Sequence, residues 1–394
     1  MKSVLILLLS LLLCMPANAQ KSVKKITKKE AAGTTVKTKN TSQSKNKTAA
    51  IAPTSKNMAS KSITNAKKET GKDTTRNDNK KDTVAQSRKN AANGQNLIQT
   101  TTQPVSTGSA APVGYLCNPP LPYKPAKLDV LFIGNSFSID TSTELPSILA
   151  SLDIQNVNVY VLYKGGCSLK EHYQYYKTDK PAYDFYLFNS KGETLLEKGT
   201  TIKNVMKRYE YDIVVFQQYS LLSGDYASYE PYLGRLIQAY KLNALSPRTT
   251  FAFNETWAYS SKHKNIKQYQ TPENMWRQIC ISTRKMKEES GIDVIIPCGT
   301  AVQNARAVPM LKTEKELTRD NQHLDLCMGR YLAACTFFES IIAPCLGRSI
   351  REDKSIIGKA GERNQVNATN RRLLQNCAKL AVANNYIVSS FAGE

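Results

Sequence analysis

Three side chains of this sequence, Ser136, Asp320 and His323, have the types and spacing that nucleophilic catalysis requires. Ser136 comes directly after a glycine–asparagine pair that ends a short apolar run. A serine hydroxyl is a weak nucleophile and needs a neighbouring base to accept its proton. An aspartate three residues before a histidine on a loop can fix the imidazole tautomer and stabilise the imidazolium that forms. The pattern predicts acyl transfer through Ser136, with His323 as base and Asp320 as its orienting carboxylate.

The choice of base is narrow because the sequence contains only three histidines. His172 lies in a predicted helix rich in tyrosine and lysine, and His263 lies between lysines in a polar loop. We interpret both as surface residues. Cys167 is a poor candidate nucleophile, because the remaining base, His323, is better matched to Ser136 and a lone cysteine is commonly a small core residue.

An alternation of apolar runs and helical patterns would position these side chains. Five apolar runs rich in branched and aromatic residues predict buried strands, and helical spacing between them predicts a parallel sheet with helices on both faces. Residues 183–189 and 193–198 predict a β-hairpin, interpreted as an excursion at the edge of the site. The predicted strands are 128–133, 158–163, 211–216, 249–253 and 293–297. The predicted helices are 144–152, 169–176, 201–208, 229–240, 272–290, 326–342 and 369–384.

Polar and glycine residues punctuate this pattern at the carboxyl ends of the predicted strands. In a parallel sheet these ends share one edge, where open α/β folds bind their ligands. The residues are Gly134-Asn135-Ser136, Gly165-Gly166, Gln217-Gln218, Asn254-Glu255 and Gly299-Thr300.

Blocks in this order resemble those of the SGNH (GDSL-like) hydrolase superfamily. More specifically, the stretches 133–138, 165–168, 216–225, 256–259 and 320–324 resemble a branch found in secreted bacterial proteins and known mainly as a domain of unknown function. The resemblance covers about residues 128–342. It implies an α/β, flavodoxin-like three-layer sandwich with a five-stranded parallel sheet, and an esterase that needs no metal or organic cofactor.

The resemblance also implies residue roles. Ser136 would be the nucleophile, His323 its base and Asp320 the residue that orients His323. The oxyanion hole would be formed by the backbone N–H of Ser136, the N–H of Gly166 (or Gly165) and a side-chain amide. Loss of one such donor typically costs roughly 2.7–4 kcal/mol of transition-state stabilisation.

The sequence departs from the commonest superfamily pattern in two places. Asn135 stands where aspartate is usual, which changes local hydrogen bonding but not the nucleophile. Gln217-Gln218 stands where a glycine and an asparagine are usual, and glutamine there resembles the carbohydrate-acetylesterase branches. Gln217, the first residue after its strand, is the preferred amide donor, and Gln218 is the alternative.

Three further residues after the fourth predicted strand are candidates for substrate binding. Trp257 and Tyr259 would form a stacking platform for a sugar ring, or else pack at the edge of the sheet. Glu255 would contact substrate, or else be a solvated loop carboxylate.

The first 19 residues have the pattern of a secretory signal peptide. Lys2 precedes an apolar run over residues 4–13, and a small-residue cleavage site, Ala17-Asn18-Ala19, follows. We expect export to the periplasm or the cell exterior. Lipoprotein anchoring through Cys14 is disfavoured because Leu13 stands where a small residue is required. No other stretch approaches the roughly 18 apolar residues of a transmembrane helix.

Residues 20–113 hold most of the positive charge. The whole chain has a net charge of +22, and this segment contains 19 Lys/Arg and 5 Asp/Glu, a net of +14. Its Lys, Thr, Ser, Asn and Ala composition predicts a disordered segment. It would act as a tether, or attract acidic envelope polymers or anionic lipid head groups. Specific nucleic-acid binding is disfavoured because aromatic residues do not interleave with the charge.

The sequence has nine cysteines, eight of them after the predicted signal peptide. An even number in an oxidising compartment permits disulfides, and we expect buried free thiols with one or two bridges. The spacings are long and include no C-x-x-C, so a zinc site is not predicted.

The sequence predicts a secreted serine esterase that removes small acyl groups, acetyl above all, from carbohydrate. A lysophospholipase or thioesterase would use the same triad but would need a long apolar groove lined by the 183–198 hairpin. A non-catalytic glycan-binding module on the same fold is favoured only if Ser136 and His323 are out of hydrogen-bond reach. An envelope-tethering role could depend on residues 20–113 alone. Residues 114–394 are the predicted hydrolase-like domain with a C-terminal helical extension.

Overall fold

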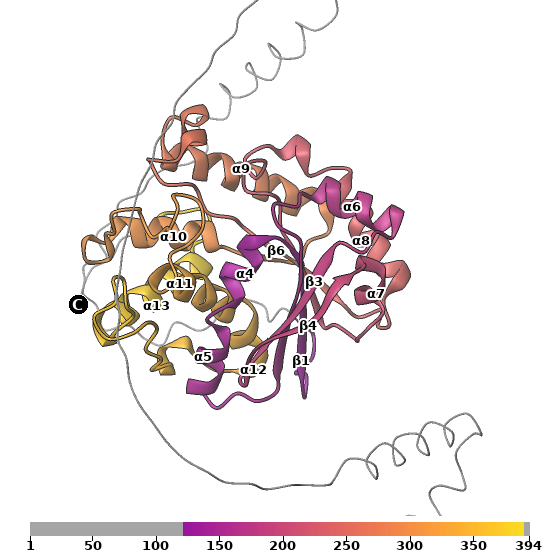
Figure 1. Cartoon of the computed structure of the whole chain (residues 1–394), viewed down its shortest axis with the longest axis horizontal. Helices are drawn as coiled ribbons and strands as arrows, with labels where there is room; N and C mark the ends of the chain where they lie inside the picture. Colours follow the sequence, from indigo (N-terminus) through magenta and orange to yellow (C-terminus); the bar gives the residue numbers. More distant parts are fainter. Residues whose placement is uncertain (1–120, 390–394) are drawn as a thin grey trace, which may run out of the picture. The chain divides into compact units, whose positions relative to one another are not determined.

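A seven-stranded sheet forms the centre of the computed structural model, which describes residues 121–389 (Figure 1). The strand order is β4-β3-β2-β1-β5-β6-β7. The predicted signal peptide, the basic segment 20–113 and Cys117 lie outside the described residues. The strands are β1 (Leu128–Gly134), β2 (Val157–Tyr163), β3 (Tyr183–Asn189), β4 (Gly192–Thr200), β5 (Ile213–Phe216), β6 (Thr250–Asn254) and β7 (Val294–Ile296).

The predicted fold class is confirmed, with one correction. Strands β1, β2, β5, β6 and β7 pair in parallel, and their spatial order is second, first, third, fourth, fifth, which is the flavodoxin-like order. The sheet nevertheless has seven strands rather than five. The predicted hairpin is not an excursion, because β3 pairs antiparallel with β2 and carries β4 at the sheet edge.

Helices cover both faces of the sheet, as expected for its buried strands. Alternate residues of β1 enter different cores: Val130 and Phe132 face one, and Leu131 and Ile133 face the other. In Figure 1, α4, α5, α10, α11 and α13 lie on one side of the sheet and α6, α7 and α8 on the other. The helices are α4 (Ser136–Ser142), α5 (Leu145–Ser151), α6 (Leu169–Thr178), α7 (Ile202–Met206), α8 (Tyr232–Asn243), α9 (Pro272–Ser290), α10 (Cys298–Ala307), α11 (Met328–Phe337), α12 (Ala343–Leu346) and α13 (Ala368–Ala383). Short 3₁₀ turns are η1 (Tyr226–Ser228), η2 (Lys264–Gln268), η3 (Pro309–Leu311) and η5 (Ile350–Glu352), and η4 (Phe338–Ile342) is a π-helical turn.

Local sequence explains which helices were predicted and which were not. The helix α9 has its predicted bounds, because Thr271 caps its first turn and Gly291 ends it in the left-handed conformation at φ 71°. Three helices, α4, α10 and the four-residue α12, were not predicted. The serine and threonine residues of α4 favour caps and turns over helix interiors, and α10 is buried nearly all round, so it has no amphipathic stripe.

The described part of the chain has no helix that is long and apolar enough to cross a membrane.

The turn between β1 and α4 requires a glycine at position 134. A Cβ atom there would lie 2.0 Å from Ser138 Oγ and 3.3 Å from Gln217 Cγ. The Ser138 hydroxyl cannot rotate away freely, because it donates a 2.8 Å hydrogen bond to Gln217 Oε1. The first turn of α4 therefore packs directly on the end of β1.

We predict that Gly134→Ala lowers the free energy of unfolding by about 1–3 kcal/mol, the usual range for overpacking. Urea denaturation measures the change. In the double variant Gly134→Ala/Ser138→Ala the loss should be smaller than the sum of the single losses, because the clashing hydroxyl is gone. Additive losses would contradict this account of the turn.

Candidate active site

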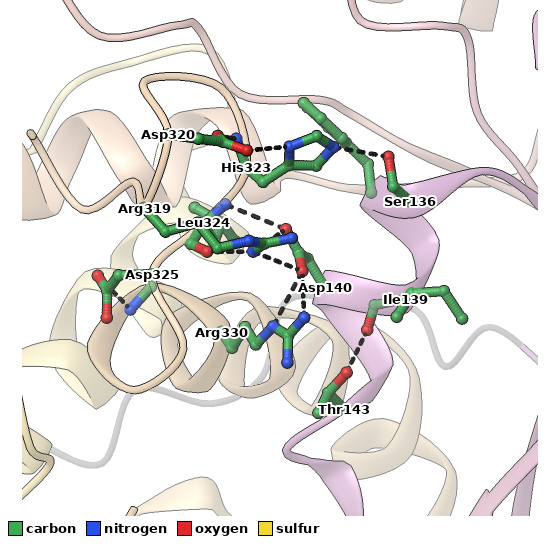
Figure 2. A network of polar contacts seen from close by, with 12 residues as sticks. Ser136, Ile139, Asp140, Thr143, Arg319, Asp320, His323, Leu324, Asp325 and Arg330 are labelled. Atoms are coloured by element: carbon green, nitrogen blue, oxygen red, sulfur yellow. Dashed lines mark hydrogen bonds and ion pairs between the residues drawn. The ribbon is translucent and has the colours of Figure 1, made fainter. Parts of the chain in front are cut away.

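The structure brings Ser136, His323 and Asp320 together in the order the sequence predicts (Figure 2). Ser136 Oγ lies 2.9 Å from His323 Nε2, and His323 Nδ1 lies 2.7 Å from Asp320 Oδ2. Ser136 is the first residue of α4, and the other two lie on the loop before α11. The geometry suits transfer of the hydroxyl proton to Nε2 while the carboxylate holds Nδ1–H.

The carboxylate of Asp320 is held ionised by its neighbours. Partial burial opposes ionisation, but hydrogen bonds from the backbone and ring N–H of His323 and from the backbone N–H of Gln322 outweigh it and lower the pKa of Asp320. The two backbone bonds to Oδ1 measure 2.7 Å from His323 and 3.1 Å from Gln322. This side chain therefore remains an acceptor for the imidazole at neutral pH.

Two backbone N–H groups near the nucleophile are available to a ligand. Ser136 is the first residue of its helix, so its N–H has no intrahelical acceptor. Gly166 is exposed, has φ +63°, and its N–H makes no hydrogen bond within residues 121–389. These are the backbone donors that the sequence-based resemblance implies for an oxyanion hole.

Asn135 joins the ends of three strands beneath the nucleophile. Its Oδ1 accepts from Phe137 N at 3.1 Å, which caps α4, and from Gln217 Nε2 at 2.6 Å. Its Nδ2 donates to the carbonyl of Cys167 at 3.0 Å. An aspartate could not make that last bond, because a carboxylate has no hydrogen to donate. The departure from the usual aspartate thus has a structural role in this chain.

The predicted amide contribution to the oxyanion hole needs correction. The side chains of Gln217 and Gln218 are both fully buried. Gln217 donates to Asn135 and accepts from Ser138, whereas Gln218 Nε2 donates to the carbonyl and hydroxyl of Ser228 at 3.0 Å each. Both glutamines fix the strand ends instead of presenting a donor to a ligand.

A buried carboxylate that the sequence did not single out links the two halves of the triad. Asp140 lies one helical turn after Ser136 and its side chain is fully buried. It forms ion pairs with Arg319 at 3.0 Å and Arg330 at 2.9 Å, and its Oδ2 accepts from Leu324 N at 3.0 Å (Figure 2). The i+4 spacing from the nucleophile and the arginine directly before Asp320 were the available sequence signals.

Trp257 does not form a sugar platform, because its side chain is fully buried. Its ring stacks on Phe137 with centroids 4.0 Å apart and an interplanar angle of 2°, and Phe137 packs edge-on against His323. The indole N–H donates to the carbonyl of Gln322 at 2.9 Å. Trp257 therefore supports the loop 320–323, so the interpretation as packing at the sheet edge is the correct one.

Tyr259 and Glu255 are buried as well, so neither presents a surface to substrate. The Tyr259 hydroxyl lies 2.9 Å from Ser220 Oγ. Glu255 Oε1 accepts from the N–H and the hydroxyl of Thr300 at 2.8 and 2.9 Å, and Oε2 has no hydrogen-bond partner among the described residues. Burial raises the pKa of Glu255 to about 7, although the bonds from Thr300 lower it in part.

Of the two remaining histidines, only His172 contradicts the expected surface position. His172 is fully buried, not at the surface, and burial lowers its pKa to about 3. Its Nδ1 lies 2.9 Å from the Tyr183 hydroxyl. His263 is partly exposed and caps η2 by accepting from Asn265 N. Neither histidine contacts Ser136.

The described cysteines form no disulfide. All seven within residues 121–389 are buried free thiols, so the expected bridges are not formed there. Burial raises the pKa of Cys167, which supports its assignment as a core residue. No group of three or more His, Cys, Asp and Glu side chains in this part of the chain could hold a metal ion.

The family model for the domain of unknown function DUF4886 matches residues 129–369. A DUF4886 family protein from Bacteroides uniformis has a solved structure that is 30% identical to this chain, with a TM-score of 0.59. The match covers 67% of this chain and 97% of that one. The chain belongs to the DUF4886 family. The sequence-based resemblance to a branch of unknown function is thereby confirmed, and no curated protein matches the chain.

SGNH hydrolases are among the other solved structures to which the chain is similar. A proposed SGNH hydrolase from Slackia heliotrinireducens is 19% identical, with 54% of this chain and 98% of that chain covered and a TM-score of 0.38. An acetylxylan esterase from Geobacillus stearothermophilus is 11% identical, with 55% and 95% covered and a TM-score of 0.35. These two likenesses are too distant to carry an argument about activity.

We predict that Asp140→Asn lowers the free energy of unfolding by about 3–5 kcal/mol, because breaking a buried ion pair leaves charges without partners. Urea denaturation measures the loss. The matched control is Asp129→Asn, whose ion pair with the exposed Lys127 should contribute at most about 1 kcal/mol. Equal losses in the two variants would contradict the role given to Asp140.

We also predict that Glu255 makes stability fall as pH rises. Its pKa is raised in the folded protein, so the unfolded chain ionises first, near pH 4.5, and the folded chain only near pH 7. Ionisation of Glu255 should therefore reduce the free energy of unfolding by roughly 3 kcal/mol as the pH rises from 4.5 to about 7. The difference between wild type and Glu255→Gln, measured by urea denaturation from pH 4 to 8, isolates it. A pH-independent difference would contradict the prediction, and the exposed Glu288→Gln is the control.

Proposed function

We propose that this protein is a serine esterase in which Ser136, His323 and Asp320 act by an acyl-enzyme mechanism. The observation that carries the proposal is the continuous contact from Ser136 Oγ through the His323 ring to Asp320 Oδ2, at 2.9 and 2.7 Å. Two unengaged N–H groups on the neighbouring backbone, from Ser136 and Gly166, add the donors that a developing oxyanion needs.

In the first step, Ser136 Oγ attacks the ester carbonyl carbon while its proton passes to His323 Nε2. The carbonyl oxygen becomes an oxyanion facing the N–H groups of Ser136 and Gly166. The imidazolium, stabilised by Asp320, then protonates the leaving alcohol as the ester C–O bond breaks. In the second step, His323 takes a proton from water as the water oxygen attacks the acyl carbon. His323 then returns that proton to Ser136 Oγ as the acyl C–Oγ bond breaks, which releases the acid and free Ser136.

For the substrate we propose small acyl esters, acetyl above all, on carbohydrate outside the cytoplasm. The predicted signal peptide supports an extracytoplasmic location, and the glutamine block resembles that of carbohydrate-acetylesterase branches. The buried Trp257 and Tyr259 no longer count in favour of a sugar. A non-catalytic glycan-binding module would be favoured if Ser136 and His323 were out of hydrogen-bond reach. The two side chains are within reach, so this alternative is disfavoured.

The test is hydrolysis of p-nitrophenyl acetate, butyrate and octanoate by the full chain. We predict that Ser136→Ala lowers kcat/KM by about 10³-fold or more and that Asp320→Asn lowers it by about 10²- to 10⁴-fold. We also predict that the acetate is preferred over the octanoate.

The matched control is Ser142→Ala, at the other end of α4. It removes a buried serine hydroxyl that has no hydrogen-bond partner among residues 121–389. Its activity should stay within about twofold of wild type. Activity that survives in Ser136→Ala would refute the mechanism. A preference for octanoate would refute the small-acyl proposal and favour the lysophospholipase or thioesterase alternative.

A further inference from the structure

A cluster of tyrosines and basic residues lies on α6, α7 and α8, on the sheet face opposite α4 (Figure 1). The tyrosines are partly buried, and the ring of each lies close to a lysine or arginine side chain. We define the tyrosine–cation face as Tyr173, Tyr176, Tyr232, Lys170, Lys177, Lys203 and Arg235.

Cation–π contacts hold the basic groups of this face in place. Each charged group lies within about 6 Å of a ring centroid, the range in which the ring quadrupole attracts a cation. The distances are 5.3 Å for Lys177 and 5.4 Å for Arg235 over Tyr173, 5.2 Å for Lys203 over Tyr176, and 6.0 Å for Lys170 over Tyr232. The positive charges are thus positioned before any ligand arrives.

The face has an excess of positive charge. Helices α6, α7 and α8 together contain five lysines and arginines and one acidic residue, Glu171. That carboxylate is engaged by the backbone N–H and hydroxyl of Ser168 in the cap of α6. Within residues 121–389, none of the five basic side chains forms an ion pair with a carboxylate. Their charges are available to an anionic ligand.

A groove of about 430 Å³ lies in this face between α6 and α8. Its lining combines Tyr173 and Tyr176 of α6 with polar groups and the exposed Leu242. Arg235 and Gln238 line it from α8, and Glu230 is its one carboxyl group. Burial raises the pKa of Glu230, although a hydrogen bond from the backbone of Gly234 lowers it in part. The groove therefore offers both cationic and hydrogen-bonding groups to one ligand.

We propose that the tyrosine–cation face binds a polysaccharide that carries carboxylate groups. The unpaired cations match the carboxylates, and the amide of Gln238 can bond sugar hydroxyl groups. A single-stranded nucleic acid fits less well, because it needs open aromatic faces on which bases stack. Here Lys177 and Arg235 occupy the ring of Tyr173, and the rings of Tyr173 and Tyr176 stack on each other with centroids 6.4 Å apart.

This binding goes beyond the proposed esterase activity and does not depend on it. The test is fluorescence anisotropy with fluorescein-labelled polygalacturonate and the full chain, in buffer of low and of physiological salt. The triple variant Lys177→Gln/Lys203→Gln/Arg235→Gln should bind about tenfold more weakly, as expected when three positive charges that face the ligand are neutralised together. Hydrolysis of p-nitrophenyl acetate by the same variant should stay within about twofold of wild type, so failure of binding and failure of catalysis are distinguishable.

The control triple variant Lys191→Gln/Lys287→Gln/Lys359→Gln removes the same charge from exposed positions elsewhere, and both variants keep the basic segment 20–113. It should change the affinity less than about twofold.

Equal losses in the two triple variants, or no binding of polygalacturonate by wild type, would overturn the proposal. Tighter binding of a thirty-nucleotide poly(dT), weakened by the first variant only, would overturn it in favour of nucleic acid. If the triple variant does not fold, the single variants Lys177→Gln and Arg235→Gln test the same point. Each should lower the affinity for polygalacturonate about twofold.

Discussion

The buried carboxylate of Asp140 is the interaction on which the candidate site depends. A carboxylate removed from water must be matched by donors, and losing one partner of a buried pair typically costs about 3–5 kcal/mol. The donors to Asp140 are Arg319 and Arg330 and the backbone N–H of Leu324. Two of them directly flank the loop 320–323, one at each end. The loop that carries His323 is therefore fixed to the helix that carries Ser136, by a contact that makes no use of either of these two side chains.

Beneath the nucleophile, a network of buried amides sets the positions of the strand ends. Asn135 and Gln217 bond each other, and Asn254 donates to Gln217 Oε1 at 3.3 Å. Each of these residues follows or ends a different parallel strand, so the network connects β1, β5 and β6 along the carboxyl edge. Buried polar networks of this kind favour one arrangement, because any displaced member would leave an unsatisfied group. The network holds Ser136 at the carboxyl edge of the sheet.

How far the sequence predicts this molecule depends on whether the signal is periodic. The five parallel strands follow from short apolar runs, and the helix α9 follows from helical spacing and its caps. Ser136 and His323 follow from their places at strand and loop ends. No comparable sequence pattern shows whether a side chain that follows the end of a strand is buried or exposed. The indole of Trp257 faces the core because Phe137 lies beneath it, a contact 120 residues apart in the chain. The role of Asp140 was hidden for the same reason, since its arginine partners are about 180 residues away.

The seven buried thiols have a consequence for how the chain matures if it is exported as its sequence predicts. In the folded domain burial raises the pKa of all seven thiols, to about 11 for Cys327 and about 12 for Cys345 and Cys377. Thiolate, the form that reacts with disulfides, is therefore scarce. The unfolded chain has no such protection. In an oxidising compartment, folding of the two hydrophobic cores then competes with the formation of non-native disulfides, and this competition sets the yield of native protein. In the finished fold, the thiols stay reduced because they are buried away from water.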